Sequence, residues 1–308
     1  MGPRLDHEPD RVVSFDGTDL AARRMGVDEG LPLLVVDAIG AGFVTWRKVM
    51  VLLADDHPLV NWDLRGLHDS SVPASDRIDA GAHAEDALSV LERYEVDRCA
   101  VVSWSSGTRI GLEIAHRYPD RVAALIMVCG GYGHPLRRLR FLEVASLLPT
   151  AAGVAKHFSG YLSGPLGAFV SRPELTGLVR QSGLIGPTAD ASVLVQTLRE
   201  AGTCDLRLML SIFEAVVGDA APHLLPEIQP PTLLVAGERD PFTSLRMMEK
   251  MRRALPEARL TVYPKATHYV PIEFPERLAE DIDAFLAERF SWPVESREET
   301  GARGGGLH

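Results

Sequence analysis

Ser103-Trp104-Ser105-Ser106-Gly107 is the most informative segment of this 308-residue chain. It stands between an apolar run, residues 100–102, and an amphipathic stretch, residues 108–118, so it predicts a tight turn between a buried strand and a helix. Such a turn needs small residues two places before and after its apex, because larger side chains would crowd the backbone. The usual pattern is Gly-x-Ser-x-Gly. Here serine takes the first position, and Ser105 is the predicted apex of a nucleophile elbow.

The same five residues also fit an ordinary strand, turn and helix in which the serine has no chemical role, since so short a pattern often arises by chance. The rest of the chain has to discriminate between the two interpretations. Apolar runs without polar alternation are typical of strands covered on both faces, and they occur at residues 31–36, 58–62, 99–102, 122–128, 231–236 and 260–263. Stretches with helical spacing separate these runs. This alternation predicts an α/β fold with a mostly parallel, doubly wound sheet.

A long segment interrupts the alternation. From residue 133 to residue 222 there is no comparable strand-like run, and Leu, Ala and Val recur at helical spacing. We interpret residues 133–222 as a helical cap inserted into a core formed by residues 1–132 and 223–292. The Gly-rich tail, residues 293–308, is predicted to be disordered.

Composition excludes several classes of partner and cofactor. A formal net charge of −10 disfavours a nucleic-acid surface, which needs clustered Lys and Arg. The three cysteines, Cys99, Cys129 and Cys204, lie too far apart to indicate a disulfide framework or a metal cluster. No metal, nucleotide or flavin motif is present, so no cofactor is expected. The chain shows no signal peptide and no run of about 20 apolar residues, which predicts a cytoplasmic protein without a membrane partner. Its oligomeric state stays open.

Two further polar residues lie where catalytic partners of Ser105 would be expected. A serine hydroxyl is a poor nucleophile at neutral pH, so a base must take its proton and a carboxylate must orient that base. Asp240 follows the predicted strand 231–236, and His268 follows the strand 260–263. The carboxyl ends of parallel strands meet at one edge of a sheet, where ligands bind. The order Ser, Asp, His along the chain is the one that this type of elbow carries.

The chain resembles the α/β-hydrolase superfamily, in particular its capped, esterase-like serine hydrolases. The resemblance extends over residues 11–290 and is loose in the cap. It rests on five motifs: Trp62-Asp63-Leu64-Arg65-Gly66, the elbow at residues 103–107, Tyr118-Pro119-Asp120-Arg121-Val122, Gly237-Glu238-Arg239-Asp240 and Thr267-His268. Together these motifs are specific for the fold and only weakly specific for a substrate.

The resemblance implies a role for each matching residue. Ser105 would be the nucleophile, His268 the general base and then acid, and Asp240 the orienting carboxylate. Some relatives place the acid after the preceding core strand, but residues 129–131 read Cys-Gly-Gly, so Asp240 is preferred. The backbone N–H groups of Ser106 and Ile39 would form the oxyanion hole.

The oxyanion loop departs from the family pattern. Relatives usually have His-Gly where this chain has Asp37-Ala38. A carboxylate facing the oxyanion would oppose the charge to be stabilised, so we expect Asp37 to turn away and to accept hydrogen bonds from loop N–H groups. The alternative is that Asp37 shapes a non-hydrolytic chemistry. Asp37 and Trp104 are both taken as candidate pocket residues.

These residues support a carboxylesterase-like serine hydrolase that cleaves an ester, or a thioester, of a small apolar molecule through an acyl-enzyme on Ser105. Apolar residues of the cap, among them Leu206, Leu208 and Leu210, motivate the apolar substrate. Two alternatives remain open. The same triad could serve an acyltransferase, a lyase or a cyclising enzyme of a small-molecule pathway, or the pocket could belong to a ligand-binding receptor.

Overall fold

The computed structural model describes residues 8–133, 185–186 and 188–290. Within them, eight strands form one sheet in the order β1-β2-β4-β3-β5-β6-β7-β8. The strands are β1 (Asp10–Val13), β2 (Asp19–Gly26), β3 (Leu33–Val36), β4 (Pro58–Trp62), β5 (Cys99–Trp104), β6 (Val122–Val128), β7 (Thr232–Gly237) and β8 (Ala258–Tyr263). The strands from β4 to β8 pair in parallel, whereas β1 and β2 pair antiparallel. The predicted mostly parallel α/β fold is confirmed.

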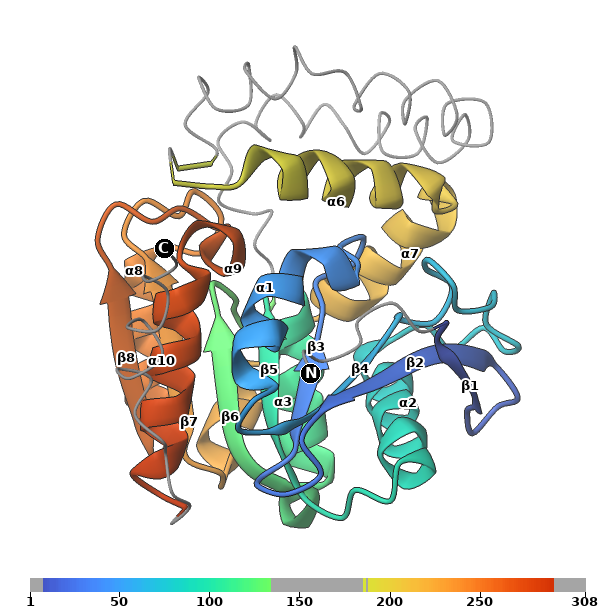
Figure 1. The fold of residues 1–308 in the computed structure, drawn as a ribbon, viewed down its shortest axis with the longest axis horizontal. Coiled ribbons are helices and arrows are strands. Elements are labelled where there is room, and N and C mark those ends of the chain that lie inside the picture. Colours follow the sequence, from blue (N-terminus) through green and yellow to red (C-terminus); the bar gives the residue numbers. More distant parts are fainter. Residues whose placement is uncertain (1–7, 134–184, 187, 291–308) are drawn as a thin grey trace, which may run out of the picture.

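Helices cover both faces of this sheet (Figure 1). One face packs against α1 (Phe43–Leu53), α9 (Val270–Glu273) and α10 (Pro275–Ala287). The other packs against α2 (Ala80–Arg93), α3 (Gly107–Arg117) and α8 (Leu245–Ala254). Two short 3-10 helices, η1 (Pro119–Arg121) and η5 (Pro222–Glu227), complete this layer.

The strand β5 shows why apolar runs without alternation become central strands. Successive side chains of a strand point to opposite faces. Accordingly Ala100 and Val102 pack with α1 and α10, while Cys99 and Val101 pack with α2 and α3. Every residue of β5 is buried, because both of its neighbours, β3 and β6, are also covered on both faces. The central position of β5 carries the elbow to the middle of the sheet edge.

The structure differs from the predicted elements in several places, among them shifts of one or two residues at the ends of β7 and β8. The strand predicted from residue 31 begins only at Leu33, after Pro32, which has no N–H for a ladder. The strand predicted to end at residue 102 continues to Trp104, because the buried Ser103 hydroxyl is satisfied by donating to the carbonyl of Ile126 at 3.0 Å. The single-turn helix α9, which directly follows Tyr269, was not predicted.

Two helices of the predicted cap fall within the described residues. They are α6 (Ala191–Thr203) and α7 (Leu206–Val217), which lie between β6 and β7 along the chain, as the helical periodicity indicates. In Figure 1, α6 lies across the end of the molecule above α1, and the Thr45 and Thr197 hydroxyls of these two helices are 3.2 Å apart. The remainder of the predicted cap, residues 134–184 and 187, and the tail, residues 293–308, lie outside the described residues. The domain boundaries therefore stay a prediction.

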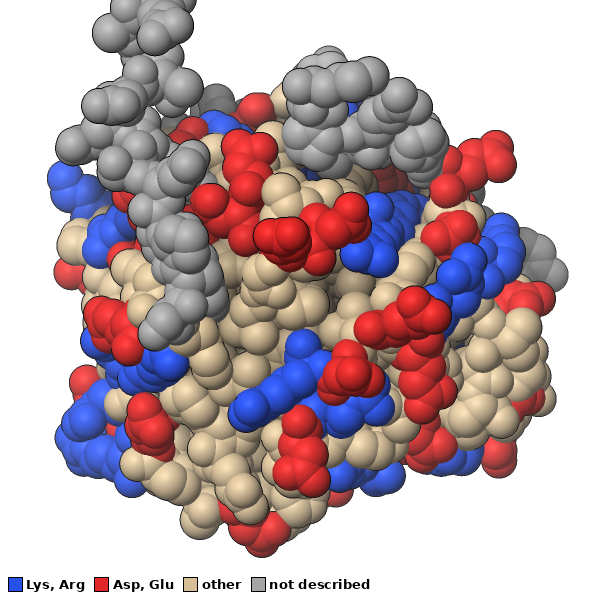
Figure 2. Space-filling view, turned by 60° about the horizontal axis from the view of Figure 1, so that its bottom comes forward, with Lys and Arg blue, Asp and Glu red and all other residues tan. Residues whose placement is uncertain are grey.

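The surface carries charges of both signs. On the face that Figure 2 shows, Lys and Arg side chains lie intermixed with Asp and Glu. Over the described ranges, no helix has the length and apolar character that crossing a membrane requires.

Candidate active site

The elbow places Ser105 at a strained turn between β5 and α3. Ser105 has a backbone φ of +54°, a region that side chains other than glycine rarely adopt and that is found at functional sites. The turn is possible because Gly107 has no side chain: a Cβ there would lie 2.4 Å from the carbonyl oxygen of Asp37. The tight turn presents Ser105 to the cavity beyond the sheet edge, as the small-residue pattern predicts.

Ser103 occupies the position where the usual pattern has glycine. Its side chain is fully buried against Gly111, where an added Cβ would lie 2.9 Å from the Ser103 hydroxyl. Gly111 on α3 thus leaves the space that the serine side chain needs. The serine that replaces the usual glycine at position 103 is therefore accommodated by a glycine at position 111 on α3.

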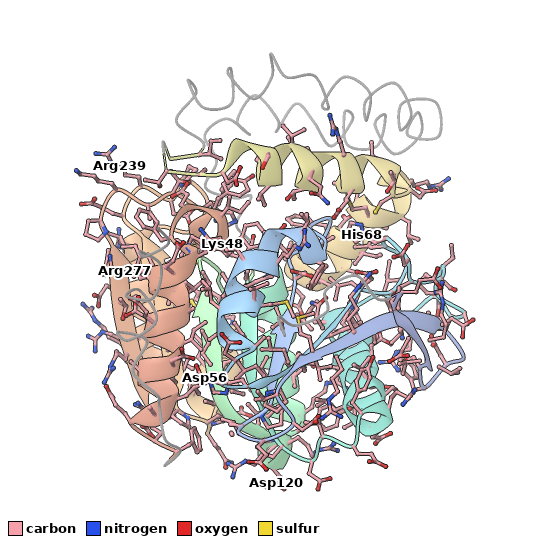
Figure 3. The ribbon with its side chains drawn as sticks, viewed as in Figure 1. Lys48, Asp56, His68, Asp120, Arg239 and Arg277 are labelled. Carbon is pink, nitrogen blue, oxygen red and sulfur yellow. The ribbon has the colours of Figure 1, made fainter. Side chains whose placement is uncertain are left out.

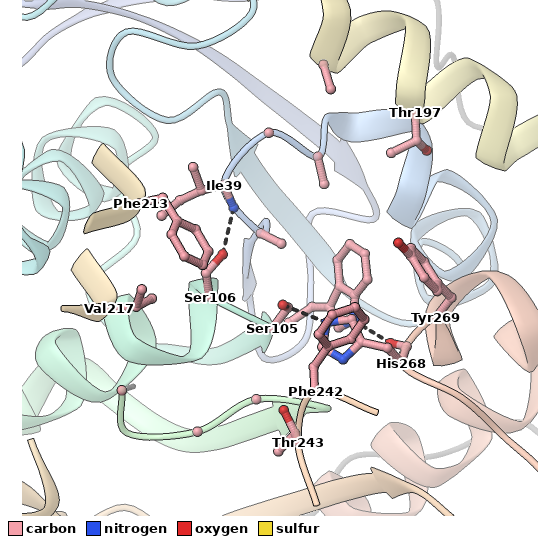
Figure 4. A pocket seen from close by; sticks show the side chains of 18 of the residues that line it. Ile39, Ser105, Ser106, Thr197, Phe213, Val217, Phe242, Thr243, His268 and Tyr269 are labelled. Carbon is pink, nitrogen blue, oxygen red and sulfur yellow. Dashed lines mark hydrogen bonds between the residues drawn. The ribbon is translucent and has the colours of Figure 1, made fainter. Parts of the chain in front are cut away.

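The three predicted catalytic side chains meet at the edge of the sheet, and Figure 4 shows the two of them that line the cavity, Ser105 and His268. His268 Nε2 lies 2.7 Å from Ser105 Oγ, and His268 Nδ1 lies 2.9 Å from Asp240 Oδ2. A carboxylate beside Nδ1 keeps the proton on that nitrogen and leaves Nε2 free to accept one from the serine. The geometry is that of a hydroxyl, an imidazole and a carboxylate in one hydrogen-bonded chain.

The loop after β7 holds the Asp240 carboxylate in place. Its second oxygen, Oδ1, accepts hydrogen bonds from the backbone N–H groups of Phe242 at 2.7 Å and Thr243 at 2.9 Å. The Thr243 hydroxyl in turn donates to the carbonyl of Cys129. Cys129 follows β6, and burial raises the pKa of its thiol well above the usual value, so it stays neutral beside the carboxylate.

His268 is held by Trp104, which was predicted only as a pocket residue, and by groups that sequence reasoning did not identify. Trp104 Nε1 donates to the His268 carbonyl at 2.9 Å, and the ring of Phe242 packs edge-on against the imidazole. The preceding residue, Thr267, donates its N–H to the buried carboxylate of Glu273 at 2.8 Å. The only signal for Glu273 in the sequence was an acidic residue at the end of the apolar run Val270-Pro271-Ile272.

A mostly apolar cavity of about 310 Å³ opens above Ser105. Ser105, Ser106 and His268 line it, together with side chains of the core loops and of α6 and α7; among the larger apolar ones are Ile39, Trp104, Leu198, Phe213, Phe242 and Met247. None of its described lining residues is Lys, Arg, Asp or Glu. Leu206, Leu208 and Leu210, which motivated the apolar substrate, are not among them, because α7 turns Phe213 and Val217 toward the cavity instead.

The oxyanion loop follows β3 and presents Ile39 to this cavity. The N–H of Ala41 donates to the Ala38 carbonyl, which closes a turn with Gly40 at a φ of +83°. The Ile39 N–H takes no part in that turn, and it donates to the Ser106 hydroxyl at 2.9 Å. Both predicted oxyanion residues therefore line the cavity, and a side chain joins them (Figure 4).

The placement of Asp37 in the pocket needs correction. Asp37 does not line the cavity; its side chain is buried behind the loop, where Oδ2 accepts a hydrogen bond from the Asn61 side-chain amide at 3.2 Å. The expected turning away from the oxyanion is observed, but the partner is Asn61 and not a loop N–H. Burial raises the pKa of Asp37 to about 7.

His68 does not line the cavity of Ser105, and it lies beside the end of α6 (Figure 3). Its Nδ1 is 3.6 Å from the Cys204 sulfur. Burial by itself would lower the pKa of His68, but the contact with Cys204 and the nearby carboxylate of Asp63 raise it to about 9. Within the described part of the chain, no three His, Cys, Asp or Glu side chains form a group that could hold a metal ion.

Comparisons with known proteins agree with this architecture. The family model of the alpha/beta hydrolase fold matches residues 32–275. The structure superposes with a TM-score of 0.70 on a thermophilic esterase from Thermogutta terrifontis, at 22% identity, over 92% of this chain and 99% of that one.

Two curated relatives resemble the chain over most of its length. It is 26% identical to the dihydrolipoyllysine-residue acetyltransferase component of the acetoin cleaving system of Pseudomonas putida, over 85% of this chain and 65% of that protein. It is 24% identical to the 2-(acetamidomethylene)succinate hydrolase of Mesorhizobium japonicum, over 91% of this chain and 96% of that protein. The chain spans only 61 to 65% of the length of several curated relatives that it matches, the P. putida protein among them. Because the family model covers more than half of the chain, this protein belongs to the family with the alpha/beta hydrolase fold.

Proposed function

We propose that this protein is a serine hydrolase that cleaves a carboxylic ester, or a thioester, of a small apolar substrate through an acyl-enzyme on Ser105. One observation carries the proposal. The hydrogen-bonded chain from Ser105 through His268 to Asp240 opens into a cavity with a mostly apolar lining.

The reaction follows from this geometry. As Ser105 Oγ attacks the carbonyl carbon, His268 Nε2 takes the hydroxyl proton and Asp240 stabilises the imidazolium that forms. The bond to the leaving alcohol then breaks, and Nε2 returns the proton to the alcohol oxygen. Water, activated by the same nitrogen, attacks the acyl carbon, and the acid leaves as Ser105 regains its proton.

The lining of the cavity supports a neutral substrate. A carboxylate placed there would lose its hydration without gaining a cationic partner among the described lining residues, which is costly. A volume of about 310 Å³ lies at the lower end of the range for small-molecule sites. We therefore expect short to medium apolar acyl groups to be accepted.

Covalent labelling tests the nucleophile. A fluorophosphonate probe should label Ser105 in the folded wild type, and p-nitrophenyl esters should be hydrolysed. Ser105→Ala should abolish labelling and lower kcat by about 10⁴-fold or more. Ser89→Ala, on α2, removes a hydroxyl whose one hydrogen bond within the described residues goes to the Glu85 carbonyl, and this variant serves as the control, with unchanged activity. A folded wild type that is neither labelled nor active on any ester would contradict the proposal.

Acyl transfer is the second candidate. It shares the acyl-enzyme and differs only in the acceptor, and the P. putida relative carries an acetyltransferase name. Adding a primary alcohol to the ester assay separates the two outcomes. Hydrolysis yields mainly the free acid, whereas a transferase yields mainly the new ester at alcohol concentrations far below that of water.

A further inference from the structure

The Ser106 hydroxyl is placed between the two expected oxyanion donors. Ser106 follows the nucleophile, and its Oγ accepts the hydrogen bond from the Ile39 N–H at 2.9 Å. Both residues line the cavity, and Ser106 is only 8% exposed. The side chain that joins the oxyanion loop to the elbow is therefore part of the cavity wall (Figure 4).

The remaining proton of this hydroxyl is uncommitted. A serine hydroxyl has one proton to donate and two lone pairs to accept with. Ser106 precedes α3, but its side chain makes no capping hydrogen bond to that helix. No acceptor for the Ser106 O–H lies among the residues that the structure describes, so this O–H remains available to a ligand in the cavity.

We infer that Ser106 contributes two donors to the oxyanion hole, its backbone N–H and its side-chain O–H. The inference rests on the proposed acyl-enzyme mechanism. When Ser105 Oγ bonds to the carbonyl carbon, the carbonyl π electrons move to the oxygen and the Ser105 proton moves to His268 Nε2. The Ser106 O–H donates a hydrogen bond to that oxyanion without losing its proton, while the Ile39 N–H holds and polarises the hydroxyl from behind.

Two physical reasons favour this arrangement over displacement of the hydroxyl. An O–H that already accepts from an N–H is a better donor, because hydrogen bonds in a chain polarise one another. A bond from a hydroxyl to an oxyanion is also charge-assisted and therefore stronger than a neutral one. If the side chain instead rotated away to free the Ile39 N–H, its hydroxyl would have to find another partner in a mostly apolar cavity.

Asp37 does not oppose the charge in this arrangement. Its carboxyl lies outside the cavity, on Asn61, and its raised pKa of about 7 keeps it partly neutral near neutral pH. The two donors to the oxyanion are therefore the N–H and the O–H of Ser106, and the Ile39 N–H supports the second by donating to its oxygen. The Ser106 O–H thus adds a side-chain donor to the backbone N–H that the elbow supplies.

Ser106→Ala and Ser106→Thr test the inference. Ser106→Ala should lower kcat for p-nitrophenyl butyrate by about 10²-fold, the usual effect of one lost oxyanion donor, with little change in KM. Affinity for a butyl trifluoromethyl ketone, which forms a covalent oxyanion adduct with the serine, should fall by a similar factor. Ser106→Thr keeps the hydroxyl and should retain at least about a tenth of the wild-type kcat. Thermal melting of each variant reports on folding.

Two results would overturn the inference. A Ser106→Ala variant as active as the wild type would mean that the hydroxyl does not serve the oxyanion, and a faster one that it competes with the oxyanion for the Ile39 N–H. Equal loss in the Ala and Thr variants would assign the effect to packing. If the wild type is active and Ser105→Ala is not, either result excludes the role of the Ser106 hydroxyl and leaves the proposed function intact. A folded wild type that never reacts with the probe or an ester removes the proposed function together with this inference.

Discussion

The two carboxyl oxygens of Asp37 have different surroundings. Oδ2 accepts a hydrogen bond from Asn61, whereas Oδ1 is buried and has no hydrogen-bond partner among the described residues. Asn61 Oδ1 is also buried without a hydrogen-bond partner among the described residues. Burial disfavours the ionised form, and the nearby carboxylate of Asp63 raises the pKa of Asp37 further. The protonated form is thus the one that this position favours.

Asp37→Asn should make the protein more stable at alkaline pH. The unfolded chain loses the Asp37 proton near its ordinary pKa of 3.8, while the native state keeps it to about 7. Asp37 therefore makes the free energy of unfolding fall as pH rises through this window. The free energy of unfolding of the variant should exceed that of the wild type by about 1 to 3 kcal/mol at pH 8, and this difference should shrink toward pH 4.

Denaturant titrations at several pH values measure this difference. Asp120→Asn, on the exposed 3-10 helix η1 (Figure 3), is the matched control and should show no such pH dependence. Parallel stability curves for the wild type and Asp37→Asn would show that the Asp37 carboxyl is ionised in the native state.

At the scale of the element, the short helix α9 connects the His268 loop to a segment within the predicted cap. The Glu273 carboxylate is only 5% exposed and accepts three hydrogen bonds. Two come from the N–H and the hydroxyl of Thr267, and the third comes from the N–H of Gly186 at 2.7 Å. One side chain therefore positions both the residue before His268 and the segment that precedes α6.

Glu273→Gln should weaken this connection. An amide has a single acceptor oxygen, so its NH₂ group must face one of the three donors, which costs about 1 to 3 kcal/mol. We expect a lower melting temperature and a lower kcat, with the pH dependence of kcat displaced because the position of His268 changes. Steady-state kinetics across pH 5 to 9 and thermal melting measure both effects.

Glu276→Gln is the control on the neighbouring helix. Glu276 pairs with Lys48 of α1 (Figure 3), but both side chains are more than half exposed. An exposed ion pair contributes little, so this variant should stay within about 0.5 kcal/mol of the wild type. If Glu273→Gln and Glu276→Gln have the same melting temperature and the same pH dependence of kcat, Glu273 does not position His268.

At the scale of the whole molecule, Arg65 joins three distant segments. Its fully buried guanidinium donates to both carboxylate oxygens of Asp86 on α2 and to Asp16 in the turn between β1 and β2. It also donates to the carbonyl of Arg77 in the loop before α2. The antiparallel strands at the sheet edge are thus tied to the helical layer through one side chain.

Arg65→Met should destabilise the protein by about 3 to 5 kcal/mol, because it leaves the buried Asp86 carboxylate without its cation. Arg252→Met, on α8, removes an exposed Arg that pairs with the exposed Glu249 and should change stability by less than about 0.5 kcal/mol. Chemical denaturation compares the two. A loss for Arg65→Met as small as that of the control would contradict a structural role for the network.

Local patterns were sufficient to predict the mostly parallel sheet with helices between its strands and the meeting of residues 105, 240 and 268. Apolar periodicity and the need for small residues at the elbow act over a few neighbouring positions, and parallel strands then place their carboxyl ends at one edge. The bond between Ile39 and Ser106 spans 67 positions, and the bond between Asp37 and Asn61 spans 24.

No local pattern encodes contacts of that kind. Whether a carboxyl is neutral, whether a serine hydroxyl faces the oxyanion loop, and which acid holds the His268 segment all depend on which groups become neighbours once the core has packed. Burial then sets the strength of each interaction, since an interior without water makes every unpaired polar group costly. The electrostatics of the site therefore arise only in the folded chain.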